Sequence, residues 1–360
     1  MKTKIISLVA GALLSIAVVI ILFRISDKIT RHHNTFIRNF PKAAYKTKEV
    51  DLRYNSFYFA GHDQNKVYLG NVSTPLQMYT VQNNILFKEK QLIKLDKVER
   101  PFHAFQVRVS TPYFYAYDGT VSCIYSGSIT DWKAQLKWIG NNFFDQAVFI
   151  DSKRIAFREQ SKTGTKIGTI DLSKNGIVKY SNEILQKQSD GIFDVDGKLL
   201  FDNSQKKVVY VYTYRNEYTV TNTQLQIAFR GTTIDTISQA QISVAVLKDR
   251  EQQKMSQPPL KVNRAALVYG NLLFINSGIL GNYEPEEMWD IASIIDIYNL
   301  TDQSYVASMY VHDVHKKKMR SFMISGDQLY ALVGDTMVTY KLSTIITSRY
   351  KLNNEKSTGR

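Results

Sequence analysis

The amino-acid sequence predicts an all-β domain that follows one apolar segment at the N-terminus. Three observations lead to this fold class. The chain of 360 residues has globular proportions, with 44% hydrophobic and 22% charged residues. It contains 22 tyrosines and 18 phenylalanines, which favour strands. After residue 45, short runs of Val, Ile, Tyr and Phe alternate with turn residues, and long helical periodicity is absent.

Residues 5–23 form an uncharged apolar run between Lys4 and Arg24. A helix of this length spans about 28 Å, close to the thickness of the hydrocarbon core of a bilayer. A cleaved signal peptide is the alternative, but the small-x-small site Ala10-Gly11-Ala12 lies inside the apolar run. We therefore expect an uncleaved transmembrane anchor over residues 1–24.

Of the net charge of +14, residues 24–48 carry +6, residues 348–360 carry +3, and residues 49–347 carry only +3. We expect a basic juxtamembrane stalk over residues 25–44, a folded domain over residues 45–347 and a basic C-terminal tail over residues 348–360. This distribution favours contact with lipid headgroups, and no basic helix or motif indicates nucleic-acid binding. The positive residues after the span favour a cytoplasmic domain, whereas the short basic head is also typical of a secretory signal-anchor. We expect an extracytoplasmic, periplasmic domain, with a cytoplasmic one as the alternative.

One pattern, an apolar strand, a polar turn and a second apolar strand, recurs six times. It covers residues 50–60, 106–116, 147–157, 191–201, 265–275 and 321–332. Two further strand candidates follow each pattern except the last, which is followed by one. Four-stranded units repeated along a chain predict a β-propeller, here with six blades. We expect residues 43–50 to supply the missing strand and close the ring, which would remove the free edge.

These hairpins, for example IFDVDGKLLF, and third strands such as KIGTIDL resemble six-bladed β-propellers of the loosely TolB-like kind, including membrane-anchored propellers of the bacterial envelope. The resemblance is architectural and covers most of residues 45–343. No Trp-Asp dipeptide ends each blade, so the subfamily is not defined. The resemblance implies scaffolding, ligand binding or protein binding more often than catalysis.

The innermost strands of a propeller all begin on one face of the disc, so the residues there should surround one mouth of the channel. Arg264 and Arg320 come from neighbouring blades and could hold a carboxylate or phosphate group. The alternative is that they neutralise two acids across the channel, Asp145 and Asp190. The full set expected at this mouth is Lys48, His103, Asp145, Asp190, Arg264 and Arg320. Further residues expected on the same face are Gly61, His62, Asp63, Tyr117, Asp118, Arg158, Glu159, Asp202, Asn203 and Asp335.

The longest loop predicted on this face is 278–290, in blade five. Tyr283, Met288 and Trp289 give it apolar area in an acidic setting, which favours recognition of a partner protein. The alternative is that Trp289 folds back against the edge of the blade. A second insertion, 248–262, has Gln, Lys and Pro in place of strand residues and is expected to be a flexible excursion between blades four and five.

The sequence gives little indication of reactive chemistry. His312 and His315 have a spacing that could hold a metal, but an extended chain would direct them to opposite faces, and we predict no metal and no cofactor. The single cysteine, Cys123, excludes an internal disulfide and is expected to be buried. No G-x-S-x-G elbow, P-loop or dinucleotide fingerprint is present, so no catalytic residue is assigned.

Two hypotheses follow for the function. The first is a membrane-anchored, non-enzymatic propeller that binds an envelope protein or a small ligand on its loop face. The second is an envelope hydrolase or lyase that acts on an anionic substrate at the channel mouth, held by Arg264 and Arg320. Catalytic groups on propellers come from different blades, so sequence spacing leaves the second hypothesis open.

Overall fold

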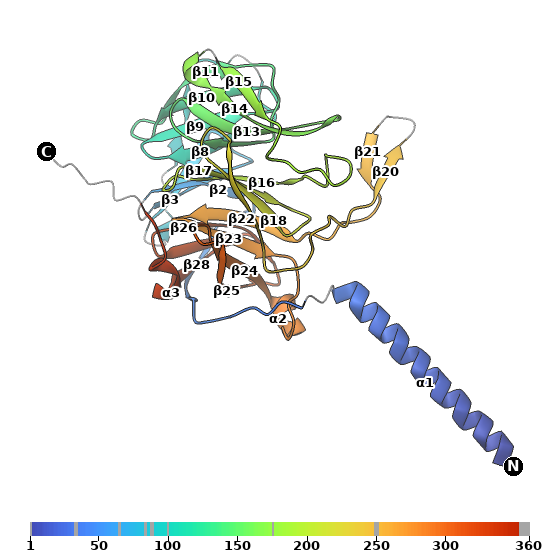
Figure 1. The fold of residues 1–360 in the computed structure, drawn as a ribbon. Helices are drawn as coiled ribbons and strands as arrows, with labels where there is room; N and C mark the ends of the chain where they lie inside the picture. Colours follow the sequence, from blue (N-terminus) through green and yellow to red (C-terminus); the bar gives the residue numbers. More distant parts are fainter. Residues whose placement is uncertain are drawn as a thin grey trace.

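The computed structural model describes residues 2–31, 35–63, 66–82, 85–86, 90–98, 101–174, 176–247 and 252–352. Over these residues the chain folds into six sheets of four or five strands arranged around a common axis (Figure 1). All neighbouring strands in them are antiparallel except β7 (Lys94–Leu95) and β11 (Lys133–Ile139) of blade two. The prediction of an all-β, six-bladed propeller with four-stranded blades, preceded by an apolar helix, is confirmed.

Apart from β7 in blade two and β1 (Ala44–Asp51) in blade six, the strands of a blade follow one another in sequence from the innermost position outward. Blade one consists of β2 (Phe57–Asp63), β3 (Lys66–Asn71), β4 (Gln77–Gln82), β5 (Ile85–Leu86) and β6 (Gln91–Leu92). Blade two consists of β8 (Gln106–Ser110), β9 (Tyr113–Asp118), β10 (Cys123–Ser128) and β11 (Lys133–Ile139), with β7 (Lys94–Leu95) outside β11. Blade three consists of β12 (Gln146–Phe149), β13 (Arg154–Ser161), β14 (Gly164–Asp171) and β15 (Ile177–Ser181), with a short 3-10 helix at Leu172–Lys174.

The second half of the ring has the same order. Blade four consists of β16 (Gly197–Asp202), β17 (Lys207–Tyr212), β18 (Glu217–Thr221) and β19 (Ile227–Thr232). Blade five consists of β22 (Asn263–Tyr269), β23 (Leu272–Ser277), β24 (Ala292–Asn299) and β25 (Ser304–His312), with α2 (Glu286–Ile291) in the loop before β24. Blade six consists of β26 (Met319–Ser325), β27 (Gln328–Val333), β28 (Thr336–Leu342) and β1 (Ala44–Asp51), and α3 (Thr344–Thr347) follows it.

The ring is closed by a strand from the beginning of the domain. Strand β1 pairs antiparallel with β28, from Ala44 opposite Leu342 to Asp51 opposite Thr336. This confirms the closing strand expected at residues 43–50. The sheet of blade six therefore contains strands from both ends of the propeller domain. This pairing closes the ring between blades six and one.

Apolar side chains fill the spaces between neighbouring blades. In the part of the chain that the structure describes, six buried clusters lie at the six blade–blade interfaces. At the interface of blades six and one, for example, Phe57 and Leu69 pack with Leu332. Each sheet thus has both faces covered, which explains why the strands read as apolar runs.

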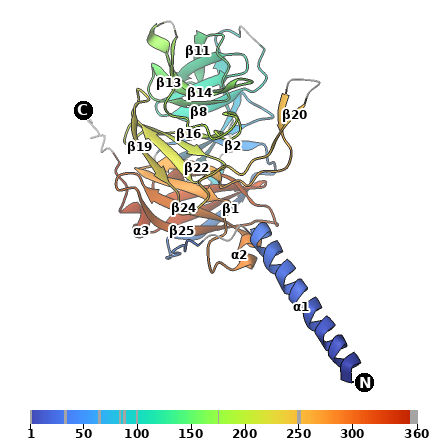
Figure 2. The same ribbon diagram turned by 45° about the vertical axis from the view of Figure 1, so that its right-hand side comes forward.

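The apolar helix α1 (Lys2–Arg31) extends away from the disc and leaves it beside α2 (Figures 1 and 2). Its segment Ile5–Ile25 has a mean hydropathy of 3.0 and is not covered by any other part of the described chain. By length and composition it is sufficient to cross a membrane, a property that a signal segment shares.

Two of the six predicted hairpins are wrong. Residues 50–60 link two blades, because β1 belongs to blade six and β2 to blade one. Residues 191–196 form a loop, and the innermost strand of blade four begins only at Gly197. Apolar residues alternate in this segment, but it does not form a strand. The Asp190 carboxylate accepts hydrogen bonds from the backbone N–H groups of Ile192 and Phe193, at 2.8 and 2.9 Å, and so holds the segment as a loop.

The structure also corrects the excursion predicted at 248–262. Part of this segment and the residues before it form a two-stranded sheet, β20 (Val244–Leu247) with β21 (Gln252–Met255). The sheet projects from the disc between blades four and five (Figures 1 and 2). The tip, 248–251, lies outside the described residues.

Candidate binding face

We call the face on which the innermost strands begin the entry face, and the opposite one the exit face. The innermost strands begin at Phe57, Gln106, Gln146, Gly197, Asn263 and Met319. Because neighbouring strands are antiparallel, the loops between second and third strands also lie on the entry face. The blade-five loop 278–290, the sheet β20–β21 and α2 therefore share one side of the disc.

Several residues predicted at the mouth or elsewhere on its face lie in other places. Lys48, predicted at the mouth, is on β1, the outermost strand of blade six, opposite Thr339, and so does not line the channel. Gly61, His62 and Asp63 end β2, Asp202 ends β16 and Asn203 follows it, which places both groups on the exit face. The reason is the two wrong hairpins, which shifted the expected strand order by one in blades one and four. The remaining mouth residues, His103, Asp145, Asp190, Arg264 and Arg320, lie at the entry-face ends of their blades.

The acids of this set already have partners. Arg158, on β13, binds Asp145 through Nε at 3.0 Å and also through Nη2. Its Nη1 donates to Asp196 at 2.5 Å. Burial alone would lower the pKa of the Arg158 guanidinium, but the bonds with Asp145 outweigh this effect and raise it. Asp145 is thus held by a guanidinium of its own blade and not by Arg264 or Arg320.

Asp118 holds the loop that carries His103. The backbone N–H groups of His103 and Ala104 both donate to Asp118 Oδ2 at 2.6 Å. Thr120 donates to Oδ1 through its hydroxyl at 2.7 Å. Burial by itself would raise the pKa of Asp118, but these hydrogen bonds outweigh it and hold the pKa below its ordinary value. Asp118 is therefore an ionised cap, and the exposed imidazole of His103 is left at the surface.

Arg264 and Arg320 differ from these arginines. Arg320 Nε donates to the backbone oxygen of Gly334 at 3.2 Å, and Arg264 lies against Gly278. Both side chains keep much contact with solvent, yet neighbouring protein atoms desolvate the guanidinium groups enough to lower the pKa of each. Among the described residues neither arginine has a carboxylate partner, so they do not neutralise Asp145 and Asp190.

The stalk binds to blade five. Residues 36–43, which we call the strap, cross this blade in extended form. The backbone N–H of Asn282 donates to the Phe36 carbonyl at 2.8 Å, and the ring of Phe40 stacks on Tyr310 with centroids 4.3 Å apart. The strap thus connects the blade-five loop with the outermost strand of the blade. Sequence reasoning treated these residues only as a basic linker.

Arg38 fixes the strap. Its side chain is fully buried and donates to Asp296 at 2.7 Å, to Glu284 at 2.6 Å and to Ser277 at 2.8 Å. Burial alone would lower the pKa of this guanidinium, but the attraction of Asp296 and Glu284 outweighs it and raises the pKa. Because each partner would be left buried and unpaired, release of Arg38 is costly.

The blade-five loop is ordered by the same contacts. Trp289 Nε1 donates to Glu284 at 2.9 Å, and the Arg38 guanidinium lies 5.9 Å from the centre of the Trp289 ring. Trp289 and Met288 are half-buried. Tyr283 is 83% exposed and has a φ of 62°, a conformation that is rare for a tyrosine. Of the three predicted contact residues, only Tyr283 is fully displayed.

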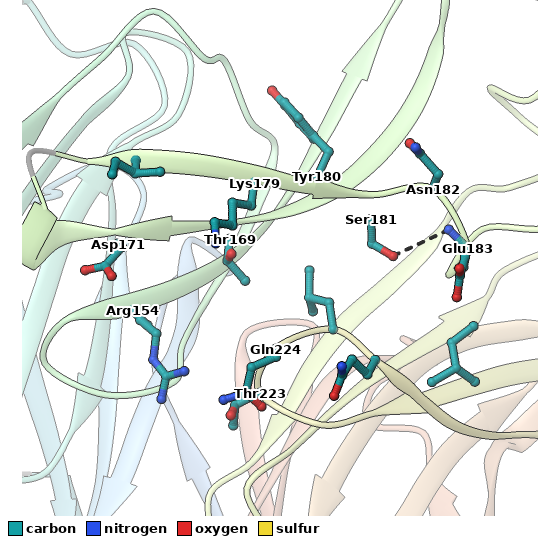
Figure 3. Close-up of a pocket in the computed structure, with 14 residues that line it drawn as sticks. Arg154, Thr169, Asp171, Lys179, Tyr180, Ser181, Asn182, Glu183, Thr223 and Gln224 are labelled. Atoms are coloured by element: carbon teal, nitrogen blue, oxygen red, sulfur yellow. Dashed lines mark hydrogen bonds between the residues drawn. The ribbon is translucent and has the colours of Figure 1, made fainter.

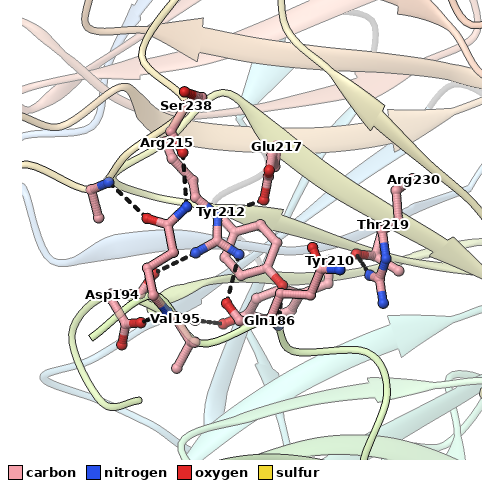
Figure 4. Close-up of polar contacts among 12 residues, drawn as sticks. Gln186, Asp194, Val195, Tyr210, Tyr212, Arg215, Glu217, Thr219, Arg230 and Ser238 are labelled. Carbon is pink, nitrogen blue, oxygen red and sulfur yellow. Dashed lines mark hydrogen bonds and ion pairs between the residues drawn. The ribbon is translucent and has the colours of Figure 1, made fainter. Parts of the chain in front are cut away.

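A second buried arginine was missed by the sequence analysis. Arg215 lies on the entry face after β17, pairs with Glu217 at 2.6 Å, and stacks 3.6 Å from the centre of the Tyr212 ring (Figure 4). It donates to the backbone oxygen of Gln186 at 2.8 Å. It therefore fixes the long connection between blades three and four. No local motif could indicate it, because Gln186 is distant in sequence.

A groove of about 780 Å³ lies at the rim of the disc, between β15 of blade three and the β18–β19 turn of blade four (Figure 3). Charged side chains of both signs line it, including Arg154, Lys179, Asp171 and Glu183. The groove is separate from the entry-face mouth and was not predicted. Its mixed lining identifies no particular ligand.

Other predicted sites show no reactive arrangement. Cys123 is buried on β10, as expected. His312 ends β25, while His315 lies in a turn with a φ of 48°. No group of three or more His, Cys, Asp or Glu side chains that could hold a metal ion occurs among the described residues.

No protein-family model and no curated protein matches the sequence. Solved structures do share its fold. A member of the DUF4221 family from Bacteroides vulgatus is 14% identical, with a TM-score of 0.50 over 83% of this chain and 97% of that one. A protein from Bacteroides fragilis, provisionally described as exported, is 10% identical, with a TM-score of 0.51 over 86% of this chain and 98% of that one. At these identities the likeness shows the fold alone.

Proposed function

We propose that the protein is a membrane-anchored β-propeller that binds a protein partner or small ligand on its entry face, without catalysis, outside the cytoplasm. The apolar helix α1 supports the anchor, because it is long enough to span a bilayer and packs on no other described part of the chain. The short basic head before the span, typical of a secretory signal-anchor, supports the location. The strap supports a fixed position of the propeller relative to the chain that follows the helix, since Arg38 pairs with Glu284 and Asp296 of blade five.

The observation that carries this proposal is the display of Tyr283. A bulky residue in the left-handed region costs about 1–3 kcal/mol and persists only where its surroundings impose it. Here Glu284 and Trp289 hold the loop, while the Tyr283 ring gains no burial in return. Exposed aromatic residues on rigid loops are typical anchors of protein interfaces. Tyr283 is therefore the residue we expect to contact the partner first.

Site-specific cross-linking in membranes tests the proposal. A photoreactive phenylalanine analogue is placed at Tyr283 and, as a control, at Tyr113, an exposed tyrosine on the exit face. We expect one discrete adduct from position 283 that is absent from position 113. Unmodified full-length chain should compete for the adduct, and its Tyr283→Ala variant should compete at least about tenfold less well. No adduct, or the same adducts from both positions, would count against the proposal.

The second candidate function is an envelope hydrolase or lyase for an anionic substrate. Arg264 and Arg320, without carboxylate partners, favour an anionic ligand in both functions. The carboxylates predicted on this face favour binding over catalysis, because Asp118 and Asp145 are held as caps and ion pairs. Activity assays of the purified full-length protein with carbohydrate and ester substrates distinguish the binding function from the enzymatic one. Turnover that disappears in Arg264→Ala and Arg320→Ala would establish the enzyme.

A further inference from the structure

Arg264 and Arg320 occupy equivalent places on neighbouring blades. On β22 the pairing with β23 shifts register between Asn263 and Ala265, so Arg264 is the extra, bulged residue. On β26 the pairing with β27 shifts between Met319 and Ser321, so Arg320 is bulged in the same way. A bulge re-aims a side chain that would otherwise follow the alternation of the strand. Of the six innermost strands as described, only these two have a bulge at the entry-face end.

Each arginine also lies over a glycine at the entry-face end of its second strand. A Cβ atom added to Gly278 would approach Arg264 Nε to 3.1 Å, and Gly334 accepts the hydrogen bond of Arg320. Strands β22 and β26 come within 8 Å of each other, measured between Cα atoms. The two blades thus carry bulged arginines at equivalent positions, at the entry-face ends of neighbouring innermost strands.

The acids around this pair are engaged with other cations. Asp335 binds Lys317 at 3.1 Å. Asp313 binds Lys318 at 3.2 Å. Glu217 pairs with Arg215, and Arg38 binds both Glu284 and Asp296.

This sector contrasts with the far side of the ring, where Arg158 binds two carboxylates. Desolvation lowers the pKa of Arg264 and of Arg320, and no attraction to an acid opposes it. An arriving anion would therefore gain two charge-assisted interactions without first displacing an internal partner.

We propose that Arg264 and Arg320 form an oxyanion subsite that binds a carboxylate or phosphate group of the ligand recognised by the entry face. The inference rests on the proposed function, since it takes this face as the binding face. The planar guanidinium group offers paired N–H donors that match the oxygens of either group.

Calorimetric titration of the full-length protein in detergent tests the subsite. The probes are inorganic phosphate and succinate, titrated at constant ionic strength. We expect saturable binding of at least one probe, and an affinity at least about tenfold lower in Arg264→Gln and in Arg320→Gln. Arg154→Gln is the matched control, because Arg154 is an exit-face arginine already bound to Asp151 at 3.0 Å. Phosphate binding alone would indicate a phosphate-bearing ligand, and succinate binding alone a carboxylate.

Two results would overturn the subsite: no saturable binding of either probe, or binding that both glutamine variants retain. Thermal unfolding of each variant verifies that the fold is kept, and Arg264→Lys should bind more weakly than wild type but more tightly than Arg264→Gln. The cross-linking experiment at Tyr283 distinguishes failure of the anion subsite from failure of the proposed partner-binding function. If the adduct persists while neither anion binds, the partner-binding role stands and the subsite is wrong.

Discussion

At the scale of single residues, the polar groups of the entry face fall into two kinds. Asp118, Asp145 and Arg158 satisfy one another or the backbone, so they stabilise the face. Arg264 and Arg320 have no carboxylate partner among the described residues and are the groups left for recognition. Residue type alone could not separate these roles, because the difference lies in which neighbours the fold supplies.

Asp118 should make stability depend on acid pH. Its folded pKa is below the ordinary value, so its contribution is complete above about pH 4 and is lost as the pH falls through the folded pKa. Urea unfolding between pH 7 and 2 should show a steeper acid loss in wild type than in Asp118→Asn. At pH 7 the variant should be less stable by about 2 kcal/mol, since the N–H groups of His103 and Ala104 lose their charged acceptor.

The control for this measurement is Asp131→Asn, an exposed aspartate that accepts one backbone hydrogen bond. It should follow the wild-type curve. Parallel pH curves for wild type and Asp118→Asn would show that the cap does not contribute in this way.

At the scale of elements, strict alternation with a tight turn predicted hairpins correctly at 106–116, 147–157, 265–275 and 321–332. It was wrong at 191–201, where apolar residues alternate in the same way but Asp190 binds the backbone of the loop. It was also wrong at 50–60, since alternation does not tell a hairpin from two strands of adjacent blades. The strap could not be predicted, because the partners of Arg38 lie more than 230 residues further along the chain.

The strap should detach when its arginine is removed. In Arg38→Met the carboxylates of Asp296 and Glu284 lose their buried cation, a change that costs about 3–5 kcal/mol at such sites. We expect hydrogen exchange of residues 36–43 to become at least about a hundredfold faster while blades one to four keep their protection. Lys42→Met, an exposed change in the same strap, should leave the exchange rates as in wild type. Unchanged protection of residues 36–43 in Arg38→Met would mean that the stacking of Phe40 on Tyr310 holds the strap on blade five without Arg38.

At the scale of the whole molecule, the strap and the closed ring place the blade-five loop on the side of the disc that the apolar helix leaves (Figures 1 and 2). The orientation of the chain in a membrane then decides which compartment the loop faces. The flanking charges alone did not decide this, because positive residues stand on both sides of the span.

Thiol labelling measures the orientation. The single cysteine, Cys123, is 1% exposed, so background labelling in the folded protein should be low. A cysteine introduced by Tyr283→Cys, at a position 83% exposed in the native chain, should react with a membrane-impermeant maleimide added outside the inner membrane. We expect labelling at least about tenfold above the background of the unsubstituted chain. Labelling that requires lysis of the inner membrane would place the domain in the cytoplasm.

Ring closure has a consequence for the growing chain. Strand β1 is synthesised first and β28 last, so their ladder cannot form until nearly the whole polypeptide has left the ribosome. During that interval β1 is an unpaired edge. Its side chains include Lys46, Lys48 and Glu49, and such charges disfavour pairing with foreign strands. These charges should therefore oppose aggregation of the nascent chain until its own final strand is available.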